Sequence, residues 1–201
     1  ADLGLEWWEP FAQGDRLALS WLTDPENPSQ MSSYSMQYFG ESGENLDWII
    51  FGGYSESDYD DVLSSPSAKL DILGEGIHIG FAGTRKLRES ASETLSLSFG
   101  LTYLNVSNET TFFSLPYPAE TLALLLPRLG LQGTLEAGSG FPGRTFWSAG
   151  VLSDAGIADE TDLATQRPGV SSGFFASQFG LTTLQPLDLF GEGTGFYLNL
   201  A

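Results

Sequence analysis

The side chains that could do chemistry in this sequence are few. His78 is the one histidine, and the chain has no cysteine. A histidine acts as a general base only beside a nucleophile or an orienting acid, and no motif of that kind surrounds His78. The absence of cysteine excludes disulfides, thiolate metal sites and cysteine nucleophiles. We therefore expect no enzymatic activity and interpret His78 as a structural residue.

Closely spaced carboxylates form the second candidate site. Asp58, Asp60 and Asp61 fall in an acidic segment, residues 54–67, that is typical of a loop. Their oxygens are hard ligands that Ca²⁺ accepts, although a complete site needs about six to eight of them. Solvated loop charge is the alternative interpretation, and no other cofactor is expected. A second acidic group shows the same pattern: Asp159, Glu160 and Asp162.

The third candidate is a basic cluster, Arg85, Lys86 and Arg88, in a chain that otherwise has few cations. Such a cluster can contact lipid phosphates or an acidic partner. It can equally be the solubilising tip of a hairpin whose charges Glu89 and Glu93 balance. The sequence leaves both interpretations open.

Composition limits the partners. The chain has 201 residues, with 26 acidic and 8 basic side chains and a net charge of −18. This charge repels phosphate backbones, so no nucleic acid is expected as a partner. No segment approaches the ~20 apolar residues of a membrane-spanning helix. The chain begins with Ala, as an exported protein does after its signal peptide is cleaved, and we expect export.

The elements that must position these residues are β-strands. Apolar residues alternate with small or polar ones over residues 77–81 and again over 95–103, which predicts a long central hairpin within residues 68–106. The apolar positions change from even to odd between Ile72 and Ile77. A one-residue slip would turn a strand over, so we predict a β-bulge at Gly74 to Gly76.

The same alternation recurs along the whole chain and predicts a single all-β domain, residues 1–201, with roughly eight to twelve strands. For residues 119–126 we favour a strand, ended by Pro127, over a short helix. The other predicted strands are residues 3–7, 17–21, 34–38, 46–51, 129–135, 145–151 and 175–184. A last apolar run, residues 187–200, is divided by the glycine-rich residues 191–195.

Segments of about ten alternating residues, with Trp and Tyr near strand ends and Ser, Thr and Gly opposite the apolar residues, resemble bacterial outer-membrane β-barrel proteins. The resemblance implies an antiparallel up-and-down β-barrel in the Gram-negative outer membrane, in contact with lipid or lipopolysaccharide. It further implies a non-enzymatic role as a small, porin-like pore, a structural barrel or a cell-surface component. Barrels of this class usually end on an aromatic residue, whereas this chain ends with Asn199, Leu200 and Ala201.

A secreted β-sandwich or jelly roll is the alternative fold, because alternation is equally expected there. It corresponds to an adhesin or a filament or coat subunit whose acidic loops bind Ca²⁺. Either fold, the barrel or the sandwich, is compatible with a protein partner or a homo-oligomer.

Overall fold

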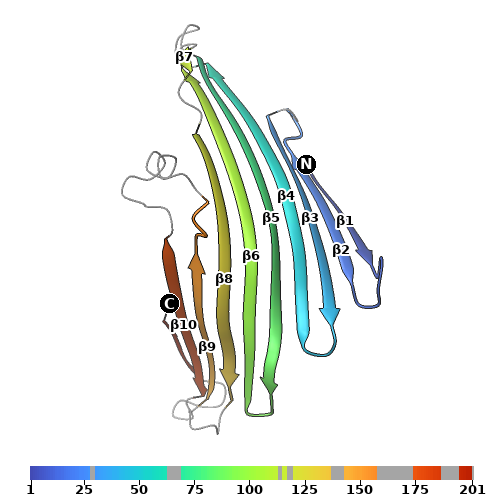
Figure 1. The fold of residues 1–201 in the computed structure, drawn as a ribbon, viewed down its shortest axis with the longest axis vertical. Helices are drawn as coiled ribbons and strands as arrows, with labels where there is room; N and C mark the ends of the chain where they lie inside the picture. Colours follow the sequence, from blue (N-terminus) through green and yellow to red (C-terminus); the bar gives the residue numbers. More distant parts are fainter. Residues whose placement is uncertain are drawn as a thin grey trace.

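In a computed structural model the described residues form one curved antiparallel sheet and contain no helix (Figure 1). The structure describes residues 1–27, 30–62, 69–112, 115–116, 120–136, 143–157, 174–186 and 195–200.

The strands follow one another across the sheet in chain order, and the two-residue β7 pairs with β6 beside this path. Their bounds are β1 Asp2–Trp8, β2 Arg16–Thr23, β3 Met31–Ser42, β4 Leu46–Val62, β5 Lys69–Glu89, β6 Glu93–Phe112, β7 Leu115–Pro116, β8 Glu120–Leu135, β9 Arg144–Ser153, β10 Phe175–Pro186 and β11 Gly195–Leu200.

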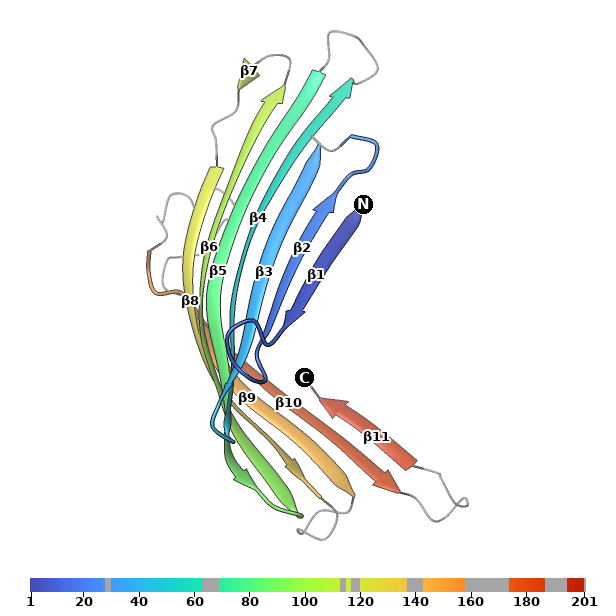
Figure 2. The same cartoon turned by 90° about the vertical axis from the view of Figure 1, so that its right-hand side faces the viewer.

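This order confirms the prediction of an all-β, antiparallel, up-and-down chain. A sandwich needs two sheets packed face to face, whereas the described strands belong to one. The outermost strands, β1 and β11, have one neighbour each, so the sheet is open. Figure 2 shows it as a curved trough. Closure into a barrel is therefore not part of the described fold.

Two short turns shape one end of the sheet. Residues 43–45 join β3 to β4, and residues 90–92 join β5 to β6. Gly43 has a φ of 66°, a backbone conformation that glycine adopts without the steric cost of a side chain. The basic cluster precedes the second turn, because β5 runs to Glu89.

The predicted bulge at Gly74 to Gly76 is wrong. The pairing of β5 with β4 and β6 continues without a break through these residues, and the register shift lies between Lys86 and Arg88. Ile72 and Ile77 simply lie on opposite faces of a continuous strand. The change of the apolar positions from even to odd numbers marks the place where the apolar residues move to the other face of the strand.

Two predicted strand ends were also wrong. β4 continues to Val62, so the first part of the expected acidic loop is strand. β8 passes through Pro127, whereas Ala119 lies outside the described residues. The pairing of β9 with β8 reaches only Arg128. Pro127 therefore occupies a position with a partner strand on one side, where the missing N–H is tolerated.

Aromatic rings lie across glycines on neighbouring strands. A Cβ atom built on Gly80 would lie 2.3 Å from Phe51 Cζ. One built on Gly133 would lie 2.8 Å from Trp147 Nε1 and 2.6 Å from the backbone oxygen of Thr94. Each ring and its glycine are directly opposite partners in the sheet. Glycine is needed here because the rings occupy the space of a side chain.

We predict that Gly133→Ala lowers the free energy of unfolding by about 1–3 kcal/mol, because a backbone oxygen cannot move aside as a side chain can. Gly150→Ala is the matched control, since its Cβ would meet the nearest backbone atoms at 3.5 and 3.8 Å. The two variants are compared by urea unfolding under identical conditions. Equal midpoints for both would refute the close approach.

Candidate functional site

The described part of the chain has almost no core. Ala82 is its one buried hydrophobic residue, and no large side chain in that part is fully buried. A soluble domain of this length buries roughly 70% of the surface that its unfolded chain exposes. The apolar residues of this sheet therefore need a cover that the described residues do not supply.

The register of the sheet places most of the exposed large apolar residues on one face, because directly opposite residues point to the same side. We call this the apolar face. One row across it runs Leu5, Leu19, Met36, Gly52, Ile79, Tyr103 and Leu125.

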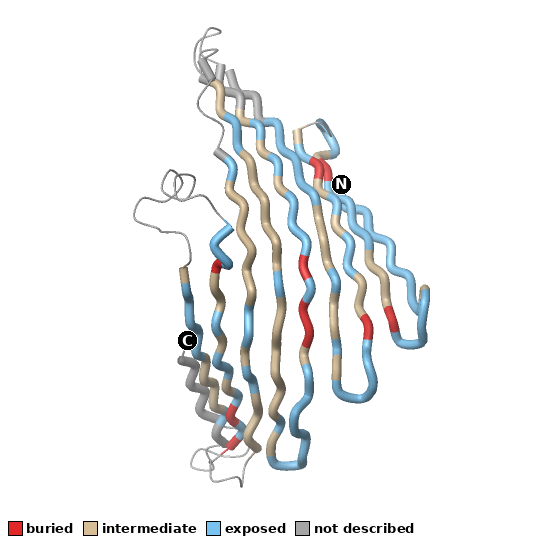
Figure 3. Tube along the Cα trace, in the orientation of Figure 1, coloured by how far each residue is buried: buried red, intermediate tan, exposed pale blue. Residues whose placement is uncertain are grey.

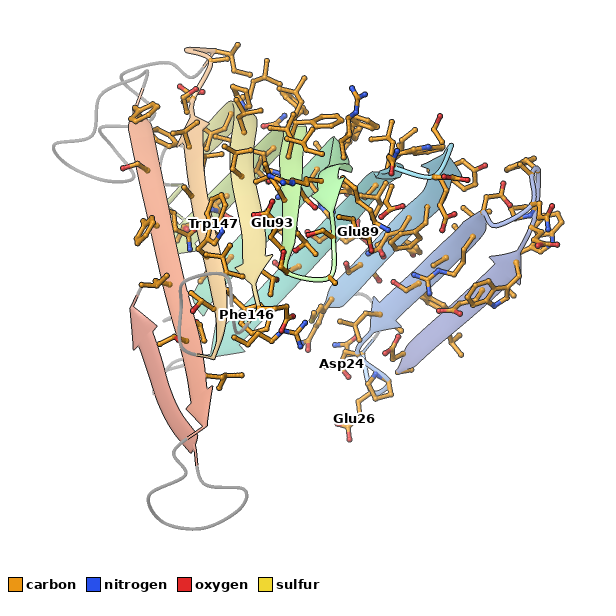
Figure 4. The ribbon with its side chains drawn as sticks, turned by 90° about the horizontal axis from the view of Figure 1, so that it is seen from below. Asp24, Glu26, Glu89, Glu93, Phe146 and Trp147 are labelled. Atoms are coloured by element: carbon orange, nitrogen blue, oxygen red, sulfur yellow. The ribbon has the colours of Figure 1, made fainter. Side chains whose placement is uncertain are left out.

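The opposite side, which we call the polar face, carries most of the small and hydroxylic residues, together with large apolar residues such as Phe51, Leu104 and Leu124. One row across it runs Asp47, Thr84, Ser98, Gly130, Gly150 and Gln178. Ser20 and Ser35 share a hydrogen bond of 2.7 Å on this face. Phe146 and Trp147 are adjacent on β9 and so belong to opposite faces, with Trp147 on the apolar one (Figure 4).

On β5 large apolar residues are exposed. Ile77, Ile79 and Phe81 are 38, 53 and 38% exposed. On the polar face of the same strand Gly80 and Ala82 are buried, whereas His78 is exposed. Figure 3 shows the same shortage of buried residues over the whole trough. Large apolar side chains on the apolar face are thus exposed, and the described residues do not cover them.

Aromatic residues gather at both ends of the apolar face on the N-terminal strands. At one end Trp21 and Tyr34 stack with ring centroids 6.2 Å apart. At the other end Tyr38 contacts Phe11 at 5.7 Å and Trp48 at 5.3 Å. Aromatic rings with a polar tip are suited to the boundary between an apolar and a wet region.

On β6 the apolar face is one continuous strip. Its members are Leu95, Leu97, Phe99, Leu101 and Tyr103. Eight residue steps of a strand cover about 27 Å, and a strand tilted by about 40° spans about 20 Å of height over that length. Beyond Tyr103 the same face continues with polar residues: Asn105, Ser107 and Glu109.

Carboxylates mark this end of the apolar face on the neighbouring strands. Glu56 and Glu75 lie directly opposite each other, and the Tyr54 hydroxyl donates a 3.1 Å hydrogen bond to Glu56. Asp58 is the next residue on the same face of β4 after Glu56, and it lies opposite Leu73. Like charges directly opposite each other are destabilising, so we expect this end to lie in water.

The predicted Ca²⁺ ligands Asp58, Asp60 and Asp61 all belong to β4, where they lie opposite Leu73, Asp71 and Leu70. The side chains of Asp60 and Asp61 are outside the described set. Within that set no three potential ligands come together as a metal site. The Ca²⁺ site stays a prediction. The second acidic group lies outside the described residues: Asp159, Glu160 and Asp162.

The basic cluster lies at the opposite end of β5. Arg88 Nη1 is 2.5 Å from Glu93 Oε1, and Lys86 Nζ is 3.7 Å from Glu89 Oε2. Charge balance at a hairpin tip, one of the two interpretations above, therefore applies to two of the three cations. Arg85 is exposed on the apolar face, opposite Leu97.

His78 lies on the polar face, directly opposite Gly53. Its ring covers this glycine, because a Cβ built there would lie 2.4 Å from His78 Cε1. The Phe51 ring is 6.2 Å away. These contacts are the same packing of ring over glycine that occurs elsewhere in the sheet and support a structural interpretation.

One organising residue was missed by the sequence analysis. Asp15 is 3% exposed, and its Oδ2 accepts hydrogen bonds from the Ala12 N–H at 2.9 Å, the Phe11 N–H at 3.3 Å and the Tyr38 hydroxyl at 2.5 Å. It thereby shapes the loop between β1 and β2 and ties it to β3. A single acid after Gln-Gly in a turn gives no sequence signal for this role.

Comparison with family models, curated proteins and solved structures finds nothing that matches this chain. Among the residues with described placement, no helix has the length and hydropathy to cross a membrane.

We predict that Asp15→Ala lowers the free energy of unfolding by about 1–3 kcal/mol, because it leaves two backbone donors and a phenol without their acceptor. Tyr38→Phe removes one of the three hydrogen bonds and should cost less. Denaturant unfolding of both variants followed by Trp fluorescence measures the difference. The assignment fails if Asp15→Ala unfolds at the wild-type midpoint.

Proposed function

We propose that this chain is a non-enzymatic β-barrel of the bacterial outer membrane, with its apolar face against lipid and its polar face lining the interior. The observation that carries the proposal is the exposure of the apolar face. Large apolar side chains such as Ile79, Leu101 and Leu129 are 53, 45 and 52% exposed on this face, and most of the small and hydroxylic residues lie on the other.

The energetics favour lipid over water as the surroundings of this face. Covering one large apolar side chain is worth about 1.5–3 kcal/mol, and the apolar face has several such residues on most strands. A bilayer supplies this cover without any protein core. It also demands that every backbone group be paired, and the antiparallel ladders meet that demand wherever two strands lie side by side.

The margins of the apolar face fit the two boundaries of a bilayer. Glu56, Glu75 and Glu109 lie beyond one margin, where water solvates carboxylates. Arg85 lies at the other, within reach of lipid phosphates, so lipid or lipopolysaccharide is the proposed partner. The polar face suits a small pore, a structural barrel or a surface component, because water-facing interiors accept small and hydroxylic residues.

The first test is the requirement for an amphiphile. We expect the purified chain to need detergent or lipid and to run faster on an SDS gel before heating than after it, because a folded barrel resists SDS until it is boiled. Light scattering and gel mobility are the measurements. A monodisperse, detergent-free protein would contradict the proposal.

The second test places one charge on either face of β6. Leu101→Arg should destabilise the protein in vesicles by about 2–4 kcal/mol, the cost of a charge near the bilayer midplane. Ser98→Arg, on the polar face of the same strand, is the matched control and should change stability little. Urea unfolding in vesicles measures both. If the two variants lose equal stability, the apolar face is not in lipid.

A further inference from the structure

We propose that β1 and β11 pair with each other, with Leu5 directly opposite Leu198, and so close the sheet. This inference rests on the proposed membrane location. It names the missing partner of both edges as the other edge of the same chain.

Both edges lack several of the features that keep a strand edge from pairing. Proteins guard exposed edges with lysine and other charges, with proline or with bulges. The charged residues of the two strands are Asp2 and Glu6 of β1, and Glu6 lies 3.8 Å from Arg16 of the neighbouring β2. The sequences of β1, DLGLEWW, and β11, GFYLNL, contain neither lysine nor proline, and β1 pairs with β2 without a register shift. In lipid an unpaired edge costs several kcal/mol for each unsatisfied backbone group. Two unguarded edges in one sheet therefore call for partners.

The direction of the strands permits this pairing. The path from β1 to β11 contains ten strands, because β7 lies beside it, and every neighbouring pair is antiparallel. An even number of alternating strands makes the first and last run in opposite directions. Closure then gives a barrel that is antiparallel throughout, as the even strand numbers of bacterial outer-membrane barrels require.

The register of the sheet fixes how far the two edges are displaced along the strands. The row of directly opposite residues that starts at Leu5 crosses β6 at Tyr103. The row that starts at Leu198 passes through Thr183, Thr145 and Leu135 and reaches β6 at Glu93. Pairing Leu5 with Leu198 thus joins rows ten residues apart.

A stagger of ten residues gives an ordinary barrel. Ten residues extend about 33 Å along a strand, and ten strands spaced by about 4.8 Å have a width of about 48 Å. The ratio corresponds to a strand tilt of about 35°, within the range of roughly 35–45° for barrels.

Strand length favours this register over the two registers shifted by two residues, which would leave the same side chains on the same face. With Leu5 opposite Leu198, all six residues of β11 have partners among the seven of β1. Leu200 opposite Leu5 would pair only four, and its row crosses β6 at Leu95, a stagger of eight and a tilt of about 30°. Phe196 opposite Leu5 would pair five.

The apolar face shows a displacement in the same direction. On β1 it is centred at Leu5, whose row crosses β6 at Tyr103. On β10 it includes Phe179 and Leu181, whose rows cross β6 at Leu97 and Leu95. The apolar face is thus displaced along the strands in the direction that closure requires.

Disulfide trapping in the full chain tests the register, and the absence of native cysteine makes each engineered pair the only one. Leu198→Cys is combined in turn with Leu3→Cys, Leu5→Cys and Trp7→Cys in protein inserted into phosphatidylcholine vesicles. Directly opposite Cα atoms lie about 4.5–5.5 Å apart, within disulfide range. The established pair Leu5→Cys with Leu19→Cys is the positive control.

We expect the Leu5 and Leu198 positions to form an intramolecular disulfide several-fold faster than either shifted pair. A faster Leu3 or Trp7 pair overturns the register. Disulfide-linked dimers, or no linkage while the control pair oxidises, overturn closure within one chain. Vesicle flotation of the same sample reports membrane insertion separately. Protein that floats but forms no disulfide between β1 and β11 rejects closure alone. Protein that does not float rejects the proposed function.

Discussion

The structure depends on one constraint, the pairing of each strand with its neighbours in the chain. Few described side chains are buried, so the backbone ladders between β1 and β11 hold the shape that a core would hold elsewhere. Each intramolecular hydrogen bond is worth only about 1 kcal/mol in water, because water competes for the same groups. In lipid that competition disappears, and the same ladders become much more costly to break.

Period-two patterning made the hairpins predictable. Within the apolar face every second residue must be apolar, so residues 3–7, 77–81 and 95–103 stood out as strands and their pairing followed from short polar turns. The strand preference at residues 120–126 was confirmed for the same reason. These predictions hold because strand geometry imposes the alternation directly on the sequence.

The features that were not predicted are those that the alternation of apolar and polar residues does not report. β4 and β5 continue beyond the apolar face into acidic residues, and a polar strand has the same composition as a loop. The bulge at Gly74 to Gly76 was inferred from a change of parity that a change of surroundings produces equally well. Asp15 and the rings over glycines depend on contacts across strands, which only the register reveals.

The exposed apolar face and the unguarded edges are two consequences of one arrangement. A sheet in water could cover its apolar face with a second layer, but that would leave both edges unpaired. Curling the sheet until β1 meets β11 pairs the edges and turns the small side chains inward, because the concave side has less room. The apolar residues then face outward on all sides. An apolar solvent would stabilise that result, so the proposed edge closure and the proposed membrane location support each other.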